Sequence, residues 1–466
     1  MKEPAPGDLR RVIGFWGGTA LIIGITIGSG IFRKPYTLAG LVPSPMLILG
    51  LWTAFGIISI CGALAIAELS SMMPKTGGVY VYLRAAYGDS AAFVYGWVYL
   101  LVATPATVGA LATFFAELFA GVFGIRMGYI PLIAGITLAI LSVANLMGAQ
   151  FGTWIGNLFT SIKIIALLML SVVSFFLVDG SFSHLAAAPD ARVDLGKLGQ
   201  AAASVIWAYD GWVAVSMITG EVVAADRLMK RIIVAGMLTI VGLYLVANVG
   251  YFHAMSLEDM AQAKAGVPQT IMGRVTGMGG VLIGFCIMCS VFGALNGNVM
   301  TKPRVSYALS RDGLTFGFLG KAHPRWGTPY AAIIIQSIVA IALVGVLTLV
   351  DPQNPQGLFD KLTTYFVVVE WFALLFTVGA VMILRRKQPY AERPFRTPMY
   401  PLVPLTFLGG TAAGLGAIVW GEWIAGNRSP VYGLLLSALG FPVYWAWRRL
   451  SRGSGPGRAA PESSPS

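Results

Sequence analysis

The stretch Ile25-Thr-Ile-Gly-Ser-Gly-Ile-Phe32 interrupts an apolar segment that runs from about residue 12 to residue 41. Each glycine in a helix interior costs roughly 1 kcal/mol of helix stability relative to alanine. A break that faced lipid would also leave backbone N–H and C=O groups without hydrogen-bond partners. Because such a stretch is costly, we expect the break to serve a function.

The composition places the chain in a membrane. Hydrophobic residues make up 56% of the sequence, charged residues only 11%, and the mean hydropathy is +0.75; a water-soluble domain of this length is far less apolar. Apolar runs of about 20 residues, each long enough to cross a core roughly 30 Å thick, predict an all-α, polytopic protein with twelve transmembrane helices. These spans are expected near residues 12–41, 45–70, 89–120, 128–149, 152–178, 197–225, 232–254, 270–299, 328–350, 359–384, 401–424 and 430–448.

The distribution of lysine and arginine predicts the orientation, since basic residues are retained on the cytoplasmic side. With the N-terminus inside, 22 basic residues fall in cytoplasmic segments and nine fall outside, while Lys163 lies within a span. Both termini are therefore expected in the cytoplasm. This topology and the anionic lipid of the inner leaflet explain the net charge of +12, so no nucleic-acid partner is expected.

The cysteines and histidines give no sign of catalysis. Cys61, Cys286 and Cys289 fall inside spans, and the three histidines are scattered along the chain. An odd set of buried thiols is no disulfide framework, and a metal site would need further ligands nearby. We expect no catalytic residues, no metal and no cofactor, and therefore no enzyme.

A second interruption, Trp207-Ala-Tyr-Asp-Gly-Trp212, lies in the middle of the sixth span. Breaks at corresponding positions of two halves are typical of a transporter binding site. Spans one and six would then open two inverted repeats of five helices each. The expected divisions are a cytoplasmic N-terminal segment at 1–11, the first repeat at 12–180, the second at 197–386, spans eleven and twelve at 401–450, and a disordered cytoplasmic tail at 451–466.

The two breaks would offer opposite partial charges to a ligand. At Gly28, Ser29 and Gly30 the outer half of span one begins with free N–H groups and a positive dipole end, which suit a carboxylate. Carbonyls left free at the end of the inner half and in the second break suit an ammonium group. A site that binds both a negative and a positive group predicts an α-amino acid zwitterion as the substrate. The alternative interpretation is that the glycines only allow close packing of helices.

Several stretches resemble one known family. They are IGSGIF, AYDGW, Phe292-Gly-Ala-Leu-Asn-Gly297, the segment 304–313 that follows it, and Pro394-Phe-Arg-Thr-Pro398. In these stretches and in their order, from about Val12 to Leu450, the chain resembles the amino acid, polyamine and organocation superfamily. Within it the chain is most similar to the L-type amino acid transporters and their bacterial relatives, such as serine/threonine exchangers. The resemblance implies a leucine-transporter-type five-plus-five inverted repeat with two extra helices, and a place in the bacterial inner membrane.

The resemblance also implies which groups would hold the substrate. Backbone amides of Ser29, Gly30 and Ile31 would bind its carboxylate. The carbonyls that would bind its ammonium belong to Thr26, Trp207, Ala208 and Asp210.

Side chains near the second break have expected roles as well. Trp207 corresponds to the aromatic residue that covers the substrate in the family, with simple packing as its alternative role. Trp212 and Val213, together with residues of spans three and ten, would limit substrate size. The side chain of Asp210 could meet a cationic substrate, although the family uses the backbone of this stretch.

Lys163 is the single charge in an otherwise apolar stretch from Phe151 to Leu177. Twelve residues of helix from Phe151 place it about 18 Å deep, near the middle of the membrane. A charge there should face protein and mark function, with bracing of helices as the alternative. The resemblance implies that Lys163 bonds the carbonyl of Gly28 and the hydroxyl of Ser290, in place of the sodium ion of sodium-coupled relatives. Sodium independence is therefore expected, while exchange and proton symport both stay open.

Two further acids lie in spans, Glu117 near the outer end of span three and Glu370 within span ten. For Glu370 a structural partnership is favoured over a role as a proton relay. The expected function is secondary active transport of L-amino acids, neutral ones above all, by alternating access across the plasma membrane. The alternatives are a proton-coupled carrier of cationic amino acids or polyamines, and an amino-acid-sensing membrane protein. The expected partners are the amino acid substrate and the lipid bilayer, and an accessory subunit is left open.

Overall fold

The structure, a computed structural model, describes residues 9–186, 193–350 and 355–453. Within these residues the chain is helical, and its one pairing of extended segments is an isolated bridge between Ile13 and Val222. The helices are α1 (Phe15–Thr26), α2 (Gly30–Leu41), α3 (Pro45–Met72), α4 (Val79–Tyr87), α5 (Asp89–Val98), η1 (Tyr99–Ala103), α6 (Thr104–Phe123), η2 (Met127–Tyr129), α7 (Ile130–Leu146), α8 (Ala149–Phe176), η3 (Phe182–Leu185), α9 (Leu195–Tyr209), α10 (Ala214–Met217), η4 (Thr219–Glu221), α11 (Ala225–Ala254), α12 (Leu257–Gln262), α13 (Val267–Val275), α14 (Gly279–Thr301), α15 (Pro303–Arg311), η5 (Gly317–Gly320), α16 (Tyr330–Val350), α17 (Pro355–Lys387), α18 (Leu402–Ile424), α19 (Ser429–Ala438) and α20 (Gly440–Gly453).

Nine helical stretches among the described residues are long and apolar enough to cross a membrane. The other three predicted spans are also helical, but shorter or divided. The sixth is split into α9 and α10, the ninth corresponds to α16, and the twelfth is split between α19 and α20. A count of apolar residues does not reveal where the sixth and twelfth spans are divided, because hydropathy does not report the backbone conformation.

Two predicted boundaries are wrong. The eighth span begins at Gly279, not near residue 270, because the segment Val267–Val275 forms the separate helix α13. Residues 451–453, predicted as the start of the disordered tail, are the last residues of α20. The rest of that tail, residues 454–466, lies outside the described residues, as do residues 1–8 of the predicted N-terminal segment.

The predicted third span is one continuous stretch made of α5, the π-helical turn η1 and α6. Pro105 lies in the first turn of α6, where its nitrogen has no hydrogen to donate to the carbonyl four residues earlier. The wider π-helical turn precedes it and shifts the helical register. As a result, the half that carries Tyr95 and Tyr99 and the half that carries Thr107 and Leu111 present different faces to the rest of the protein.

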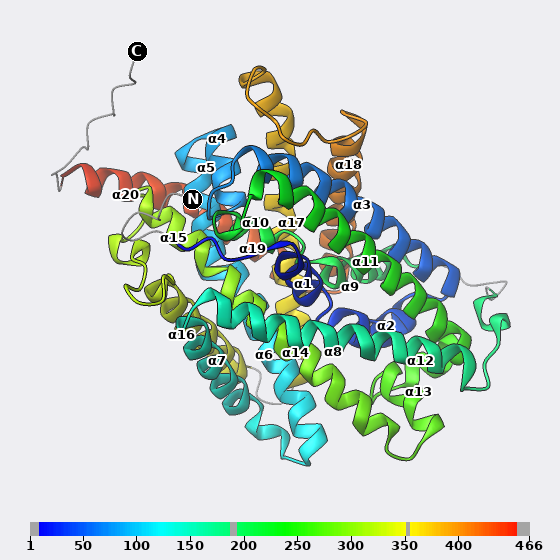
Figure 1. The fold of residues 1–466 in the computed structure, drawn as a ribbon. Helices are drawn as coiled ribbons and strands as arrows, with labels where there is room; N and C mark the ends of the chain where they lie inside the picture. The colour runs from blue at the N-terminus through cyan, green and yellow to red at the C-terminus, as the bar shows by residue number, and fades with distance from the viewer. Residues whose placement is uncertain (1–8, 187–192, 351–354, 454–466) are drawn as a thin grey trace.

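The short helices of the two breaks lie at the centre of the molecule. Figure 1 shows α1, α2 and α9 near the middle, with α3 and α11 on one side and α8 and α14 on the other. In agreement, α1 contacts α8, α11 and α14, and α2 contacts α9. The interrupted segments are therefore shielded from lipid, as backbone groups without helical partners require.

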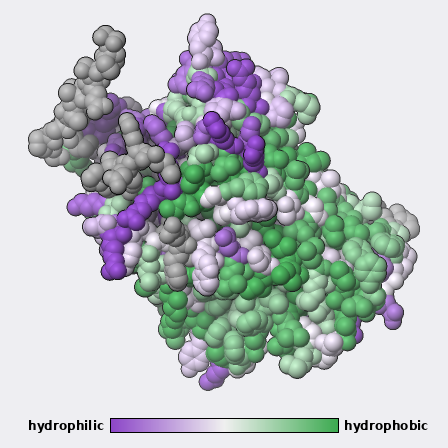
Figure 2. All heavy atoms as spheres, viewed as in Figure 1, coloured by the Kyte–Doolittle hydropathy of each residue, from purple (hydrophilic) through white to green (hydrophobic). Residues whose placement is uncertain are grey.

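The surface is strongly apolar over most of one face. Figure 2 shows hydrophobic residues over its lower and middle parts and hydrophilic residues toward the top, where Figure 1 places the loop between α17 and α18. Large apolar side chains, among them Phe176 and Trp154, are exposed on the surface of the protein. Exposed apolar area of this extent is suited to contact with lipid.

Candidate functional site

The first interruption consists of three residues between α1 and α2. Helix α1 ends at Thr26 and α2 begins at Gly30. The N–H of Gly28 donates to the carbonyl of Thr26 at 2.8 Å, although a continuing helix would direct it to Gly24. No side chain among the described residues caps the start of α2, so backbone donors are available at this end.

The second interruption follows α9. Asp210 has an extended backbone, and Gly211 has a φ of +118°, a conformation that favours glycine. A Cβ on Gly211 would also lie 2.8 Å from the side chain of Ile25. On the other side of the contact, a Cβ on Gly30 would lie only 2.4 Å from the Cα of Ala208. The glycines thus let the two interruptions touch each other directly.

A small cavity of about 20 Å³ lies between the interruptions. Its lining residues are Ile25, Thr26, Gly28, Ser29, Gly30, Thr107, Leu111, Trp207, Asp210 and Asn298. One water needs about 10–15 Å³ of such space, so an amino acid does not fit. The structure therefore describes a state that is closed around the site.

The lining differs in part from the predicted set. The predicted residues Ile31, Ala208, Trp212 and Val213 are not among its lining residues. Trp212 instead packs against Phe407 of α18, with ring centroids 6.3 Å apart. The sequence analysis missed Ile25, Thr107, Leu111 and Asn298. The i, i+4 spacing of Thr107 and Leu111 places both on one helix face, but it does not tell which face is turned inward.

Trp207 closes the cavity on one side. Its indole Nε1 donates to the hydroxyl oxygen of Ser29 at 3.0 Å, which joins α9 to the start of α2. Its ring makes edge contacts with Phe359 and Phe366 of α17, at centroid distances of 5.8 and 5.6 Å. The side chain thus links both interruptions to α17.

Three of the four carbonyls predicted to bind an ammonium group, those of Thr26, Trp207 and Ala208, have partners in this state. The hydroxyl of Tyr244, on α11, lies 2.9 Å from the carbonyl oxygens of both Thr26 and Ala208, and its single O–H is shared between these two acceptors. The carbonyl of Trp207 accepts from the N–H of Asp210 at 3.2 Å. A carbonyl oxygen accepts two hydrogen bonds. The Thr26 carbonyl also accepts from the N–H of Gly28, so both of its positions are used, whereas one position remains on the carbonyls of Trp207 and Ala208. Tyr244 was not singled out in the sequence, where it is one tyrosine within a long apolar helix.

Lys163, on α8, is fully buried, with 0% of its surface exposed. Its ammonium donates to the carbonyl oxygens of Gly24 at 2.6 Å, Ile27 at 2.8 Å and Ser290 at 2.9 Å. An ammonium has three N–H donors, and all three are used. Lys163 therefore joins the end of α1 to the middle of α14.

The contacts of Lys163 correct two expected details. It bonds the carbonyls of Gly24 and Ile27 instead of that of Gly28, and the carbonyl of Ser290 instead of its hydroxyl. The hydroxyl of Ser290 donates to the carbonyl of Ile27 at 3.0 Å. The reason is the turn at Gly28, whose N–H bonds Thr26 and so leaves the Gly24 carbonyl without its helical donor.

Ion pairs bridge the helices at the predicted outer end. Arg33 lies 2.5 Å from Glu117 of α6, and Lys34 lies 2.7 Å from Asp360 of α17. The guanidinium of Arg33 also lies over the ring of Phe359, 4.4 Å from its centroid. Glu117 thus has a cationic partner on α2, and this end is closed by contacts from α2 to α6 and α17.

A buried ion pair lies at the opposite end. Arg304 donates to both carboxylate oxygens of Glu221, at 2.8 and 3.0 Å, and each side chain is only 1% exposed. The carbonyl of Glu221 accepts from the N–H groups of Val12 and Ile13. This pair therefore ties the segment that leads into α1 to the end of the second interruption and to α15.

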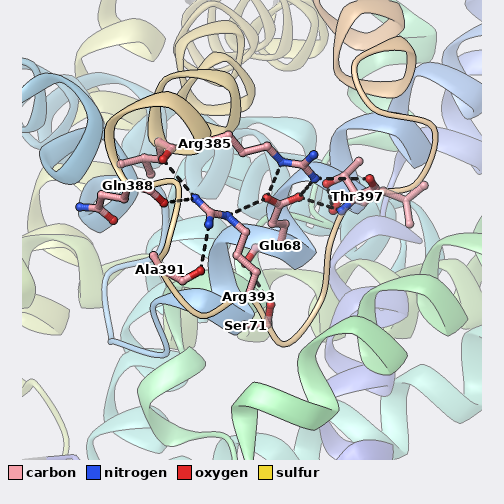
Figure 3. Close-up of polar contacts among 9 residues, drawn as sticks. Glu68, Ser71, Arg385, Gln388, Ala391, Arg393 and Thr397 are labelled. Carbon is pink, nitrogen blue, oxygen red and sulfur yellow. Dashed lines mark hydrogen bonds and ion pairs between the residues drawn. The ribbon is translucent and has the colours of Figure 1, made fainter.

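The Pro394–Pro398 stretch is held by a carboxylate that the sequence analysis did not single out. Figure 3 shows Glu68 of α3 between Arg385 and Arg393. Arg385 donates to Glu68 at 2.9 and 2.6 Å, and the N–H of Thr397 donates to it at 2.7 Å. The loop between α17 and α18 is thereby attached to the end of α3.

Comparisons with known proteins agree with this architecture. A family model described as an amino acid permease matches residues 13–446. The serine/threonine exchanger SteT of Bacillus subtilis (strain 168) is 31% identical over 444 residues, which cover 95% of this chain and 98% of that protein. The b(0,+)-type amino acid transporter 1 of Homo sapiens is 27% identical, with 87% of this chain and 82% of that protein covered. The large neutral amino acids transporter small subunit 2 of Mus musculus is 28% identical, with 94% and 81% covered.

The matching relatives are transporters and exchangers of amino acids, and the family model spans nearly the whole chain. The described residues supply the apolar helices that a polytopic membrane protein needs. The chain belongs to the amino acid permease family, and it is an amino acid transporter, not an enzyme.

Proposed function

We propose that the chain is a sodium-independent exchanger of neutral L-amino acids that works by alternating access in the plasma membrane, the inner membrane of a bacterium. The observation that supports this most directly is the position of the Lys163 ammonium, which bonds the carbonyl of Gly24 in α1, that of Ile27 directly after α1, and that of Ser290 in α14. A fixed positive charge at this junction supplies what a bound metal cation would supply. Transport then needs no sodium ion.

The proposed topology has twelve transmembrane helices with both termini in the cytoplasm. Residues 12–180 and 197–386 form two inverted repeats, and residues 401–450 add two helices. The central position of α1, α2 and α9 supports this arrangement, since a transporter site lies where interrupted helices of two repeats meet.

The proposed substrate site opens when α2 and α9 separate. The amides of Ser29, Gly30 and Ile31 then receive the carboxylate, because the start of a helix favours an anion. Carbonyls receive the ammonium, and they belong to Thr26, Trp207, Ala208 and Asp210. Trp207 acts as the gate, since its bond to Ser29 must break for a substrate to enter.

The coupling we propose is exchange, not proton symport. All three N–H donors of Lys163 have carbonyl acceptors, and loss of a proton would remove one of these bonds and the positive charge that strengthens the other two. Ser290 and Gly28 support this junction, the first through its hydroxyl bond to Ile27 and the second through its turn. The Bacillus subtilis relative is a serine/threonine exchanger, which supports the same mode for this chain.

A second candidate function is transport of cationic amino acids. Asp210 lines the central cavity, and its Oδ1 atom is buried without a hydrogen-bond partner among the described residues. A substrate with a second positive charge would satisfy this oxygen. A neutral apolar side chain would leave this oxygen without a partner.

Counterflow uptake into proteoliposomes tests both candidates. The purified protein is assayed with twenty amino acids and several polyamines, with and without substrate inside the vesicles. We expect uptake of small neutral amino acids that requires internal substrate and is equal in sodium and choline buffers. Uptake that sodium or an imposed proton gradient drives without internal substrate would refute exchange, and preference for arginine or lysine would favour the second candidate. Binding without flux would indicate a sensor.

A further inference from the structure

A second cavity, of about 520 Å³, lies apart from the central one. It is bounded by α4, α5, η1, α17, α19 and α20. Its lining includes Tyr95, Glu370, Phe372, Ala373, Phe376 and Phe441. Phe372, Phe376 and Phe441 are exposed on the apolar surface, so the cavity opens toward the lipid.

One buried carboxylate lies in this apolar lining. Glu370 is only 1% exposed, and neither of its carboxylate oxygens has a hydrogen-bond partner among the described residues. The hydroxyl of Tyr95, which lines the same cavity, is buried and also lacks a partner in that part of the chain. Protonation of Glu370 would remove its charge but would leave an O–H donor and a C=O acceptor unmatched. Unmatched polar groups in an apolar site are costly.

Lys302 interacts with Glu370 but does not donate a hydrogen bond to it within the described residues. The ammonium of Lys302 interacts electrostatically with both Glu370 and Asp210, so one positive charge serves two carboxylates. Lys302 donates a hydrogen bond to the hydroxyl of Tyr99 at 3.0 Å, and it lies over the rings of Tyr99 and Phe366. The group of Asp210, Lys302 and Glu370 thus has an excess of one negative charge when both acids are ionised.

We propose that this second cavity binds a lipophilic amine, whose protonated nitrogen lies at Glu370 and Tyr95 and whose apolar chain lies along the aromatic residues at the opening. These oxygens are buried behind the apolar lining in this state, so the nitrogen reaches them when the side chains that cover them turn aside. Its charge then balances the carboxylate, and its N–H groups satisfy the unpartnered oxygens. Cavities of roughly 300–1,000 Å³ hold drug-sized ligands, and this one falls within that range. A single-chain amine can reach Glu370 from the lipid, whereas a phospholipid head group stays at the membrane interface because of its polarity.

This site is separate from the proposed transport site. Glu370 lines the second cavity and not the central one, and Asp210 lines the central cavity and not the second. The inference therefore does not rest on the proposed substrate or on the proposed exchange. Binding is measured directly, so its failure leaves the transport proposal untouched.

Photolabelling of the full chain in proteoliposomes tests the proposal. The probe is a dodecylamine that carries a diazirine near the end of its chain, and the neutral comparison is the matching dodecanol. Labelled peptides are identified by mass spectrometry. We expect the amine to label segments 366–376 and 95–99, with competition by unlabelled dodecylamine and not by dodecanol.

Two variants separate ionic recognition from simple filling of an apolar groove. Glu370→Gln should reduce amine labelling by about tenfold or more, since the counter-charge is lost, and should leave dodecanol labelling unchanged. Ala373→Trp, which fills the cavity, should reduce both labels. The matched control is Glu422→Gln, because Glu422 is also buried in a membrane helix but is bonded to Asn427 at 2.6 Å.

Folding of each variant is checked by its melting temperature and its elution as a single species. Equal amine labelling of the native protein and a folded Glu370→Gln variant would overturn the proposal. So would equal labelling of these segments by amine and alcohol, with competition by either compound, because lipid alone would then explain the cavity. If Glu370→Gln does not fold, the competition experiment on the native protein and the Ala373→Trp variant decide the outcome.

Discussion

The ammonium of Lys163 donates a 2.8 Å hydrogen bond to the carbonyl of Ile27, the residue directly after the end of α1. That carbonyl would accept from the backbone four residues on if the helix continued. The lysine thus takes the place of a missing helical donor. Because the same ammonium bonds Ser290 of α14, the break in α1 is stabilised by a residue of another helix, and movement of α1 requires these bonds to rearrange.

Replacement of Lys163 by methionine should abolish exchange. The variant retains an unbranched apolar chain but removes the ammonium from three buried carbonyls. Ile27 still accepts from the Ser290 hydroxyl, so the cost of about 1–3 kcal/mol for an unsatisfied group applies to the carbonyls that keep no other donor. We expect counterflow to fall by at least about tenfold, since the junction between α1 and α14 is lost, and the melting temperature to fall with it. Lys197→Met, at an exposed lysine, should leave both unchanged. Native rates in a folded Lys163→Met variant would contradict the proposed role.

Alanine at Gly30 and at Gly40 should have opposite effects, although both glycines lie in α2. A Cβ at Gly30 would lie 2.4 Å from the Cα of Ala208, which cannot move aside, whereas a Cβ at Gly40 would meet nothing within 4 Å. Gly30→Ala should destabilise the protein by about 1–3 kcal/mol through overpacking and should impair transport. Gly40→Ala should stabilise it by about 0.5–1 kcal/mol, as expected for an exposed helical glycine. Thermal unfolding in detergent and counterflow measure the two effects, and equal stability losses would show that the contact with Ala208 is unimportant.

The Trp207–Ser29 hydrogen bond should favour the closed state. Trp207→Phe keeps an aromatic ring against Phe359 and Phe366 but removes the indole donor. One hydrogen bond contributes about 0.5–1.5 kcal/mol, so the KM for exchange should change by less than about tenfold. Ser29→Ala should have the same effect, and the double variant should add nothing further, since both changes remove one interaction. Additive effects of the two changes would mean that the residues act independently.

Substitution in the Arg304–Glu221 pair should lower the unfolding free energy more than substitution in any other ion pair described here. Both side chains are 1% exposed, and removal of one partner from a buried pair costs about 3–5 kcal/mol. Glu221→Gln should therefore lower the unfolding free energy by several times more than Asp89→Asn. Asp89 pairs with Arg84 at a more exposed position, and such pairs contribute at most about 1 kcal/mol. Denaturant titration in detergent compares them, and similar losses would mean that water reaches the buried pair.

Much of the fold could be predicted from the chain alone. Hydropathy indicated the class, and glycines in apolar segments indicated the break after Thr26 and the break at Gly211, because glycine is unfavourable in a helix without compensation. The lone charge in span five likewise pointed to Lys163. These features are local, and local sequence is sufficient to detect them.

The composition of the site could be predicted only in part. Trp212 and Val213 follow the second break directly, yet they do not line the cavity, since the turn at Gly211 directs Trp212 toward Phe407. Thr107 and Asn298 come from helices far away in the sequence. Tyr244 was missed because nothing in its immediate sequence distinguishes it from other residues of α11. Glu68 is the one charged residue of α3, a signal that the sequence did offer, and Lys302 lies between α14 and α15.

By itself, the sequence determined that this protein lies in a membrane, that two of its helices are interrupted, and that one lysine is buried in the apolar region. Apolar runs, glycines and isolated charges act through local free energies, which a single chain displays. Only the tertiary structure decided that Lys163 bonds Gly24, Ile27 and Ser290, and that Glu370 lies unpaired in a second cavity. These relationships depend on how helices distant in sequence are rotated and packed, and a rotation of one residue turns a side chain by about 100°.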